Sequence, residues 1–179
     1  MDRWANPALA LVILLGTAAC ATPAEEELRA GTTLPSGWFA EPAAPAGADA
    51  QTRLVWVFRT ADCLSCQSFD YAVRRLQSTY GDSLPFVAVH VGDAEREQVP
   101  RSFFRARRIQ VARTLTLPPR QFSRRYRDTG LPALLVVRGS TVAWSSSLPA
   151  GVADAAQMDS LIQDVRRKVS EGARGDDGT

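Results

Sequence analysis

The hydrophobic positions of this chain form short apolar runs and helically spaced sets, which alternate along the sequence. Apolar runs rich in β-branched residues, typical of buried strands, occupy residues 53–59, 84–91 and 133–138. Apolar residues at helical spacing occupy residues 67–80, which Gly81 follows as a stop, and residues 154–169. A strand, a helix and a second strand form a βαβ unit with parallel strands and a right-handed crossover. The pattern predicts an α/β domain.

Smaller elements are predicted between and after these segments. We expect a helix at residues 95–108, an extended segment at 111–117, a helix at 119–127 and an edge strand at 141–145. Pro119 suits the first turn of the helix predicted at residues 119–127. Gly139 and Ser140 form the turn that leads into the antiparallel edge strand. The predicted architecture is a central mixed sheet flanked by helices.

The N-terminus has the layout of an export signal. A charged start is followed by the apolar residues 8–16, which are too few to span a bilayer that needs about 20. Small residues that end at Cys20 resemble a bacterial lipobox, which implies cleavage before Cys20 and lipidation of its sulfur. Cleavage after Ala21 is the alternative. Both routes predict a folded part at an extracytoplasmic face or in the periplasm, and lipidation favours the outer membrane where the organism has one.

The composition divides the chain into four parts. We expect a signal peptide at residues 1–20, a flexible tether at 21–50, a single domain at 51–171 and a disordered tail at 172–179. The tether is rich in Ala, Pro, Gly and Glu, a composition that buries too little surface to offset its ordering entropy. Docking of Trp38 and Phe39 onto the domain is the alternative.

Charge restricts the function classes only weakly. The 179 residues are 45% hydrophobic, as in globular domains, and carry 21 basic and 19 acidic side chains for a net charge of +2. This balance gives no argument for nucleic-acid binding. Residues 101–127 are the exception, with nine arginines and no acid. Both a solvated surface and attraction to anionic lipids or an acidic partner remain open for this stretch.

The candidate chemistry lies in a Cys-x-x-Cys motif. Cys63 and Cys66 directly follow the first predicted strand and open the first predicted helix. The amides and dipole of a helix N-terminus favour an anion, so this position stabilises a thiolate at Cys63. A thiol one turn later, Cys66, can attack a mixed disulfide on Cys63 and release the substrate. The placement predicts thiol–disulfide exchange.

Three other uses of the cysteine pair remain open. A structural disulfide is compatible with an oxidising compartment, although closing so short a loop gains little entropy. Zinc requires further ligands, and His90 is the only histidine; copper delivery requires more soft ligands than two methionines supply. We expect no metal and no cofactor besides the redox-active disulfide. His90, in an apolar strand, is interpreted as structural.

Residues 53–169 resemble a thioredoxin-fold domain, in which the Cys-x-x-Cys motif occupies this place. Residues 129–137 (TGLPALLVV) are similar to the Gly-x-Pro-strand signature of that family. This resemblance implies a cis Leu131–Pro132 bond beside the motif and a Leu131 backbone that accepts an extended substrate. The predicted helix and strand at residues 95–117 resemble the insertion of TlpA-type exported thiol–disulfide oxidoreductases.

The chain departs from the family pattern close to the motif. Val57 stands six positions before Cys63, where thioredoxins carry a buried carboxylate, and Ser65 stands where proline is common. The N-terminal hairpin of the TlpA branch is not visible in residues 21–50. These departures leave open the proton acceptor of Cys66 and the direction of electron flow.

The resemblance implies an exported, membrane-tethered thiol–disulfide oxidoreductase. In this interpretation Cys63 is the nucleophile, Cys66 is the resolving thiol, and Leu131 and Pro132 hold the substrate strand. The expected partners are protein thiols and disulfides, a regenerating redox partner, and the membrane through lipid on Cys20; we expect a monomer without nucleic acid. The alternative is a tethered binding module with a static Cys63–Cys66 disulfide.

Overall fold

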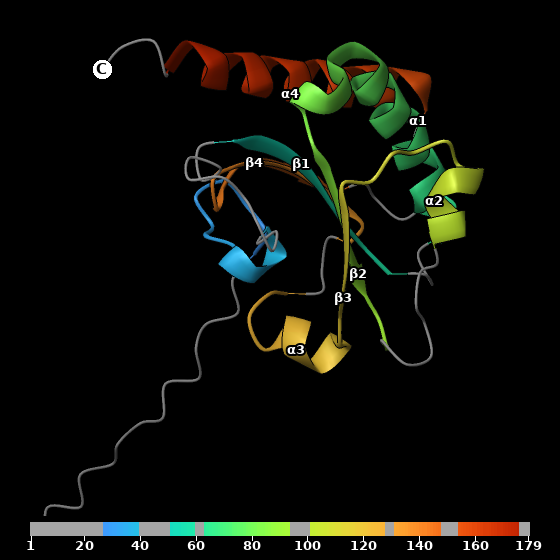
Figure 1. The fold of residues 1–179 in the computed structure, drawn as a ribbon, viewed down its shortest axis with the longest axis vertical. Coiled ribbons are helices and arrows are strands. Elements are labelled where there is room, and N and C mark those ends of the chain that lie inside the picture. Colours follow the sequence, from blue (N-terminus) through green and yellow to red (C-terminus); the bar gives the residue numbers. More distant parts are fainter. Residues whose placement is uncertain are drawn as a thin grey trace, which may run out of the picture.

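A five-stranded sheet between two layers of helices forms the centre of the molecule (Figure 1). The computed structural model describes residues 27–39, 51–59, 63–93, 101–127, 131–147 and 154–175, with the backbone alone at 63–69, 101–102 and 172–175. The strands are β1 (Thr52–Phe58), β2 (Phe86–Val91), β3 (Arg113–Leu117), β4 (Ala133–Arg138) and β5 (Thr141–Ser147). The helices are α1 (Cys63–Tyr80), α2 (Arg101–Ala106), α3 (Pro119–Ser123) and α4 (Ala155–Gly175), with short 3-10 turns η1 (Ser36–Trp38) and η4 (Gly81–Ser83). The predicted mixed α/β sheet is confirmed.

The strand order, β3-β2-β1-β4-β5, places β1 in the middle of the sheet. β1 is parallel to β2, with Val57 opposite Val89, and antiparallel to β4, with Val57 opposite Ala133. β3 continues the parallel half beside β2, and β5 continues the antiparallel half beside β4. The carboxyl ends of β1 and β2 and the beginning of β4 therefore meet at one edge of the sheet.

Alternate residues of the strands enter two separate cores. On one face, Trp56 and Phe58 of β1 pack with the buried sides of α1 and α4. On the other face, Val55 and Val57 pack with Phe122 of α3 and with residues from the N-terminal segment. Figure 1 shows α1 and α4 on one side of the sheet, and α3 and the blue N-terminal segment on the other.

Local interactions explain where α1 ends and where α4 begins. α1 ends at Tyr80, and the next residue, Gly81, has a left-handed φ of +53°, which suits glycine. Before α4, the Gln157 amide donates to Asp154 Oδ1 (2.8 Å) and the Asp154 amide donates to Gln157 Oε1 (3.1 Å), a reciprocal capping box.

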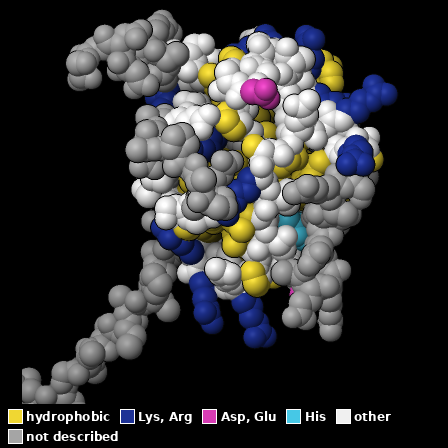
Figure 2. All heavy atoms as spheres, in the orientation of Figure 1, with side chains coloured by type: hydrophobic (Ala, Val, Ile, Leu, Met, Phe, Trp, Pro, Cys, Tyr) yellow, Lys and Arg dark blue, Asp and Glu magenta, His cyan; other side chains and the backbone are white. Residues whose placement is uncertain are grey.

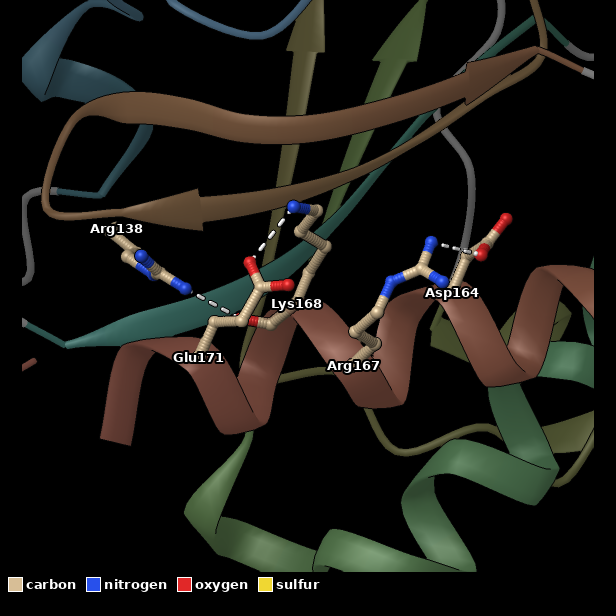
Figure 3. A network of polar contacts seen from close by, with 5 residues as sticks. All are labelled: Arg138, Asp164, Arg167, Lys168 and Glu171. Carbon is tan, nitrogen blue, oxygen red and sulfur yellow. Dashed lines mark hydrogen bonds and ion pairs between the residues drawn. The ribbon is translucent and has the colours of Figure 1, made fainter. Parts of the chain in front are cut away.

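The C-terminal helix is longer than expected. The sequence predicts its end at residue 169 and a disordered tail from 172, but α4 continues to Gly175, so the tail prediction is wrong for residues 172–175. Contacts near its end support the extension: Lys168 Nζ pairs with Glu171 Oε2 at 2.8 Å, and Arg138 Nη2 of β4 donates to the Lys168 carbonyl at 2.6 Å (Figure 3). Residues 176–179 lie outside the described residues.

The two short helices end earlier than the sequence predicts. α2 closes in a Schellman motif: Ile109 N–H donates to Phe104 O, Arg108 N–H donates to Arg105 O, and Arg108 has a φ of +56°. This motif turns the chain into the segment before β3. α3 ends at Ser123, although one more turn follows, in which the Tyr126 amide donates to Phe122 O.

The N-terminal segment requires a correction. Residues 27–39, predicted as part of a flexible tether, lie against β5 and the second core. The Gly31 amide donates to Val142 O and the Val142 amide donates to Thr32 O, with an antiparallel bridge between Thr33 and Thr141. Leu34 and Trp38 are 1% and 3% exposed. We call residues 27–39 the strap. The tether prediction is wrong for these residues, and its alternative, docking of Trp38 and Phe39 onto the domain, is confirmed.

Candidate active site

The Cys-x-x-Cys motif lies where the central strand passes into α1, one of the two long helices of the first core. β1 ends at Phe58, and α1 begins at Cys63, so Cys63 and Cys66 occupy the first turn of an 18-residue helix. The predicted strand-to-helix junction is therefore present. Residues 60–62 and the side chains of both cysteines lie outside the part that the structure describes.

The Leu131–Pro132 bond is cis, as the resemblance implies. Pro132 directly precedes β4, and the pairing of Val57 with Ala133 places the start of β4 beside the end of β1. The cis-proline segment and the beginning of α1 thus lie at the same edge of the sheet. Whether Leu131 and Pro132 hold a substrate stays a prediction.

Leu131 borders a cavity of about 270 Å³ that the strap helps to form. The lining residues are Glu27, Leu28, Arg29, Arg127, Leu131, Ala133, Ser145 and Ser147. Glu27 and Arg127 form an exposed ion pair across it, at 3.8 Å between Oε1 and Nη1. The cavity combines charged groups and serine hydroxyls beside the cis-proline segment. No pattern in the sequence indicated this cavity, because the strap was predicted to be part of a flexible tether.

An aromatic cluster supports the end of β1. The Phe58 ring stacks on Trp56 at 4.4 Å and on Phe103 at 5.9 Å. His90 of β2 is fully buried, with its ring 5.4 Å from Phe58. This buried position agrees with the interpretation of His90 as a structural residue. These rings fix the strand from which the chain turns into the cysteine motif.

A buried carboxylate lies on α1 itself and was missed by the sequence analysis. Val57, at the position where thioredoxins carry a carboxylate, is fully buried in the second core. Asp70 of α1 is only 7% exposed. Burial raises its pKa from 3.8 to about 6, because desolvation outweighs the opposing charges of Arg107 and Arg74. The signal in the sequence was the four-residue spacing from Cys66.

The arginine-rich stretch does not form one uniform surface. Several of its side chains have partners within the fold: Arg107 with Asp70, Arg125 with the Thr33 carbonyl and Arg127 with Glu27. Arg108, between α2 and β3, lines two cavities of about 740 and 810 Å³. Figure 2 shows Lys and Arg side chains, in dark blue, at several separate places on the visible face.

The described residues include no group of three or more His, Cys, Asp or Glu side chains placed to hold a metal ion. Within the same residues, no helix combines the length and the apolar character that crossing a bilayer requires. Residues 1–26, which include Cys20 and Ala21, lie outside the described part, so the predicted signal and lipidation remain predictions.

Comparison with solved structures shows the thioredoxin-like fold, at low sequence identity. A thioredoxin-like protein in its oxidised form matches with a TM-score of 0.57 and 18% identity, covering 82% of this chain and 99% of that one. The thioredoxin domain of a thiol-disulfide oxidoreductase from Bacteroides vulgatus matches at 0.54 and 14%, covering 79% and 98%. A candidate thiol:disulfide interchange protein DsbE from Chlorobium tepidum matches at 0.53 and 18%, covering 79% and 99%.

Sequence comparisons add no family assignment: no family model matches the chain, and no curated protein does. The similarity to these solved structures is therefore one of fold. The predicted thioredoxin fold is confirmed.

Proposed function

We propose that this protein is an exported thiol–disulfide oxidoreductase that exchanges disulfides with protein substrates through Cys63 and Cys66. The observation that carries the proposal is the position of Cys63 as the first residue of α1, directly after the central strand, in a thioredoxin-like fold. The structural similarity to thiol-disulfide oxidoreductases supports the same chemistry.

The proposed reaction begins with attack on a substrate disulfide. The N-terminus of α1 favours the Cys63 thiolate, which bonds to one substrate sulfur while the other leaves as a thiolate and takes up a proton. Cys66 then loses its proton and attacks Cys63. The Cys63–Cys66 disulfide forms and the second substrate sulfur leaves. The substrate disulfide is reduced and the cysteine pair is oxidised; oxidation of a substrate dithiol is the reverse.

Leu131 and Pro132 are the proposed binding residues for the extended substrate. They directly precede β4 at the edge of the sheet where α1 begins, and Leu131 borders the cavity formed with the strap. A peptide that pairs with the Leu131 backbone would place its side chains near this cavity. Its charged and hydroxyl groups suit polar substrate side chains.

A redox titration tests the proposal. The full chain is equilibrated in graded glutathione buffers, and free thiols are counted after acid quenching and alkylation. We expect a reversible two-electron transition between about −120 and −270 mV, which Cys63→Ser and Cys66→Ser both abolish. In addition, Cys66→Ser should accumulate mixed disulfides, whereas Cys63→Ser should not. A disulfide that stays closed below about −300 mV would contradict the proposal.

The second candidate is a binding module with a static Cys63–Cys66 disulfide. Val57, a buried apolar residue in place of the thioredoxin carboxylate, favours this candidate. The same titration separates the two, since a static disulfide shows no transition in the working range.

Membrane attachment is a separate part of the proposal. We propose lipidation of Cys20 after cleavage before it, which would hold the domain at an extracytoplasmic membrane face. Each buried methylene of the acyl chains would contribute about 0.8 kcal/mol to membrane binding. Mass spectrometry of the mature protein should show a lipid-modified Cys20 as the first residue; an unmodified Cys20 would contradict this part and leave the redox proposal standing.

A further inference from the structure

Asp70 is a buried carboxylate held in a fixed position on α1. Its Oδ2 lies 3.0 Å from Arg107 Nε. The Arg107 guanidinium lies over the Phe103 ring, 3.7 Å from its centroid, and its Nη1 donates to the Phe103 carbonyl at 3.3 Å. Arg74 Nη1 donates to the Arg107 carbonyl at 3.4 Å. Arg107, which follows α2, is thus itself anchored, and it positions the carboxylate.

The register of α1 relates this carboxylate to the cysteine motif. Asp70 follows Cys66 by four residues within one continuous helix. Residues four apart in an α-helix lie on the same face, with Cβ atoms about 5–6 Å apart. Helical side chains also lean towards the helix N-terminus, which is the direction from residue 70 towards residue 66. Asp70 therefore occupies the neighbouring position, one turn beyond Cys66.

The surroundings of Asp70 suit a group that exchanges protons near neutral pH. Burial raises its pKa to about 6, whereas the positive charges of Arg107 and Arg74 oppose this shift. Among the described residues, these two arginines, one after α2 and one on α1 itself, are the charged groups that act on the carboxylate. At pH 7 the carboxylate is mostly ionised and able to accept a proton.

We propose that Asp70 accepts the proton of the Cys66 thiol, directly or through one water molecule, when Cys66 resolves the mixed disulfide on Cys63. This inference rests on the proposed function. The Cys66 S–H bond breaks, its proton moves to an Asp70 oxygen, and the sulfur bonds to Cys63 while the substrate thiolate leaves. Asp70 of α1 thereby acts as the proton acceptor. Val57 of β1, which stands where thioredoxins carry a buried carboxylate, has no group that could do so.

A structural role for the Asp70–Arg107 pair is the competing explanation, since the pair ties α1 to the segment after α2. Breaking a buried pair lowers stability whether or not Asp70 takes part in exchange. A structural role does not, however, make the rate of mixed-disulfide resolution depend on the ionisation of Asp70. The pH profile of that single step separates the two explanations.

The experiment follows the mixed disulfide with glutathione. The reduced full chain, carrying Cys20→Ser so that two thiols remain, is mixed with glutathione disulfide at about pH 5 to 8. Acid-quenched samples are analysed by mass spectrometry for the glutathionylated intermediate and the closed disulfide. The variants are Asp70→Asn and Arg107→Gln, with Asp82→Asn, an exposed aspartate after α1, as the matched control. Circular dichroism checks that each variant is folded.

In the protein with Asp70 intact, resolution should slow as the pH falls through about 6, where Asp70 becomes protonated. Asp70→Asn should slow resolution at pH 7 at least about tenfold and remove this inflection, while intermediate formation continues. Arg107→Gln should move the inflection to higher pH, since the arginine charge lowers the pKa of Asp70. Asp82→Asn should leave the profile unchanged.

Two results would overturn the inference, and only one of them also overturns the proposed function. If Asp70→Asn resolves the intermediate at the original rate with the original pH profile, Asp70 is not the acceptor and the proposed function stands. If the protein with both cysteines intact forms neither the intermediate nor the closed disulfide, the proposed function fails, and the Asp70 inference fails with it. Should Asp70→Asn not fold, an unmoved inflection in Arg107→Gln is the overturning result.

Discussion

The two faces of the sheet are covered in different ways. On the first face lie two long helices, α1 of 18 residues and α4 of 21 residues, each with a continuous apolar side. On the second face lie the strap and the five-residue α3, which contribute a few large side chains. Yet the strand residues beneath are equally buried, since Val55 and Trp56 both have 0% exposure.

This difference shows that short segments can complete a core when their anchors are large. A helix of five residues is not stable alone in water, so α3 depends on the burial of Phe122 and Tyr126. The strap depends similarly on Leu34 and Trp38, and on backbone bonds to β5, which is otherwise an edge strand. Trp38 meets Tyr126 edge to face, at 5.9 Å between ring centroids, and so joins the two short segments.

The largest expected effect is from removing the strap's main anchor. Trp38→Ala should lower the free energy of unfolding by about 3–5 kcal/mol, as for other buried aromatic truncations. Leu76→Ala, at a fully buried position of α1, should cost about 2–5 kcal/mol on the opposite face. Urea unfolding of both variants measures the comparison, and Tyr71→Ala, at a side chain 42% exposed, is the control with a small expected loss.

If Trp38→Ala lowers the free energy of unfolding by less than about 1 kcal/mol, this result contradicts the structural role of the strap. The second face would then be closed by α3 alone.

The next effect concerns a charge buried on the first face. Because the pKa of Asp70 is raised from 3.8 to about 6, the folded state binds this proton more tightly than the unfolded state. Its contribution to stability is fully present below about pH 4 and is lost as the pH rises through about 6, by about 3 kcal/mol. Asp70→Asn should remove this part of the pH dependence. Urea unfolding between about pH 4 and 7 measures it.

The strap offers the matched control for this titration. Glu27 forms its ion pair with Arg127 on the surface, where both side chains are 54% exposed. Glu27→Gln should therefore change the free energy of unfolding by less than about 1 kcal/mol, since exposed pairs contribute little. If Asp70→Asn keeps the original pH dependence, the carboxylate does not titrate near 6 in the folded protein.

The contrast between the faces also explains what the sequence could reveal. β1, β4 and the apolar sides of α1 and α4 follow regular periodicities, so their existence and order were predictable, although α4 extends beyond the predicted residue 169. The strap follows no period, because its buried residues are separated by prolines, glycines and polar residues. Its attachment depends on β5 and α3, which are distant in sequence, and composition alone indicated a tether.

The candidate site also divides into features that the sequence predicts and features that only the tertiary structure reveals. The local sequence pattern predicted that Cys63 and Cys66 follow β1. The similarity of residues 129–137 to the Gly-x-Pro-strand signature, which implies the cis bond, was also visible in the sequence. The burial of Asp70 was not, since its environment is made by Arg107 and Phe103 from a segment more than thirty residues away. The cavity beside Leu131 depends likewise on the strap. Tertiary contacts therefore determine the surroundings of the motif.

The smallest expected effect tests backbone conformation on both faces. Gly31 of the strap has φ +92° and Gly81 after α1 has φ +53°, and a Cβ on either would meet no atom within 4 Å. Any cost of alanine is therefore conformational: about 1 kcal/mol at Gly81, inside the left-handed region, and about 1–2 kcal/mol at Gly31, outside it. Gly37→Ala, with no left-handed φ and open space, is the control and should change stability by less than about 0.5 kcal/mol. A cost at Gly31 arises only if the strap is ordered in the folded state and released on unfolding. Thermal or urea unfolding of the three variants therefore tests, without removing any side chain, whether the second face is as firmly closed as the first.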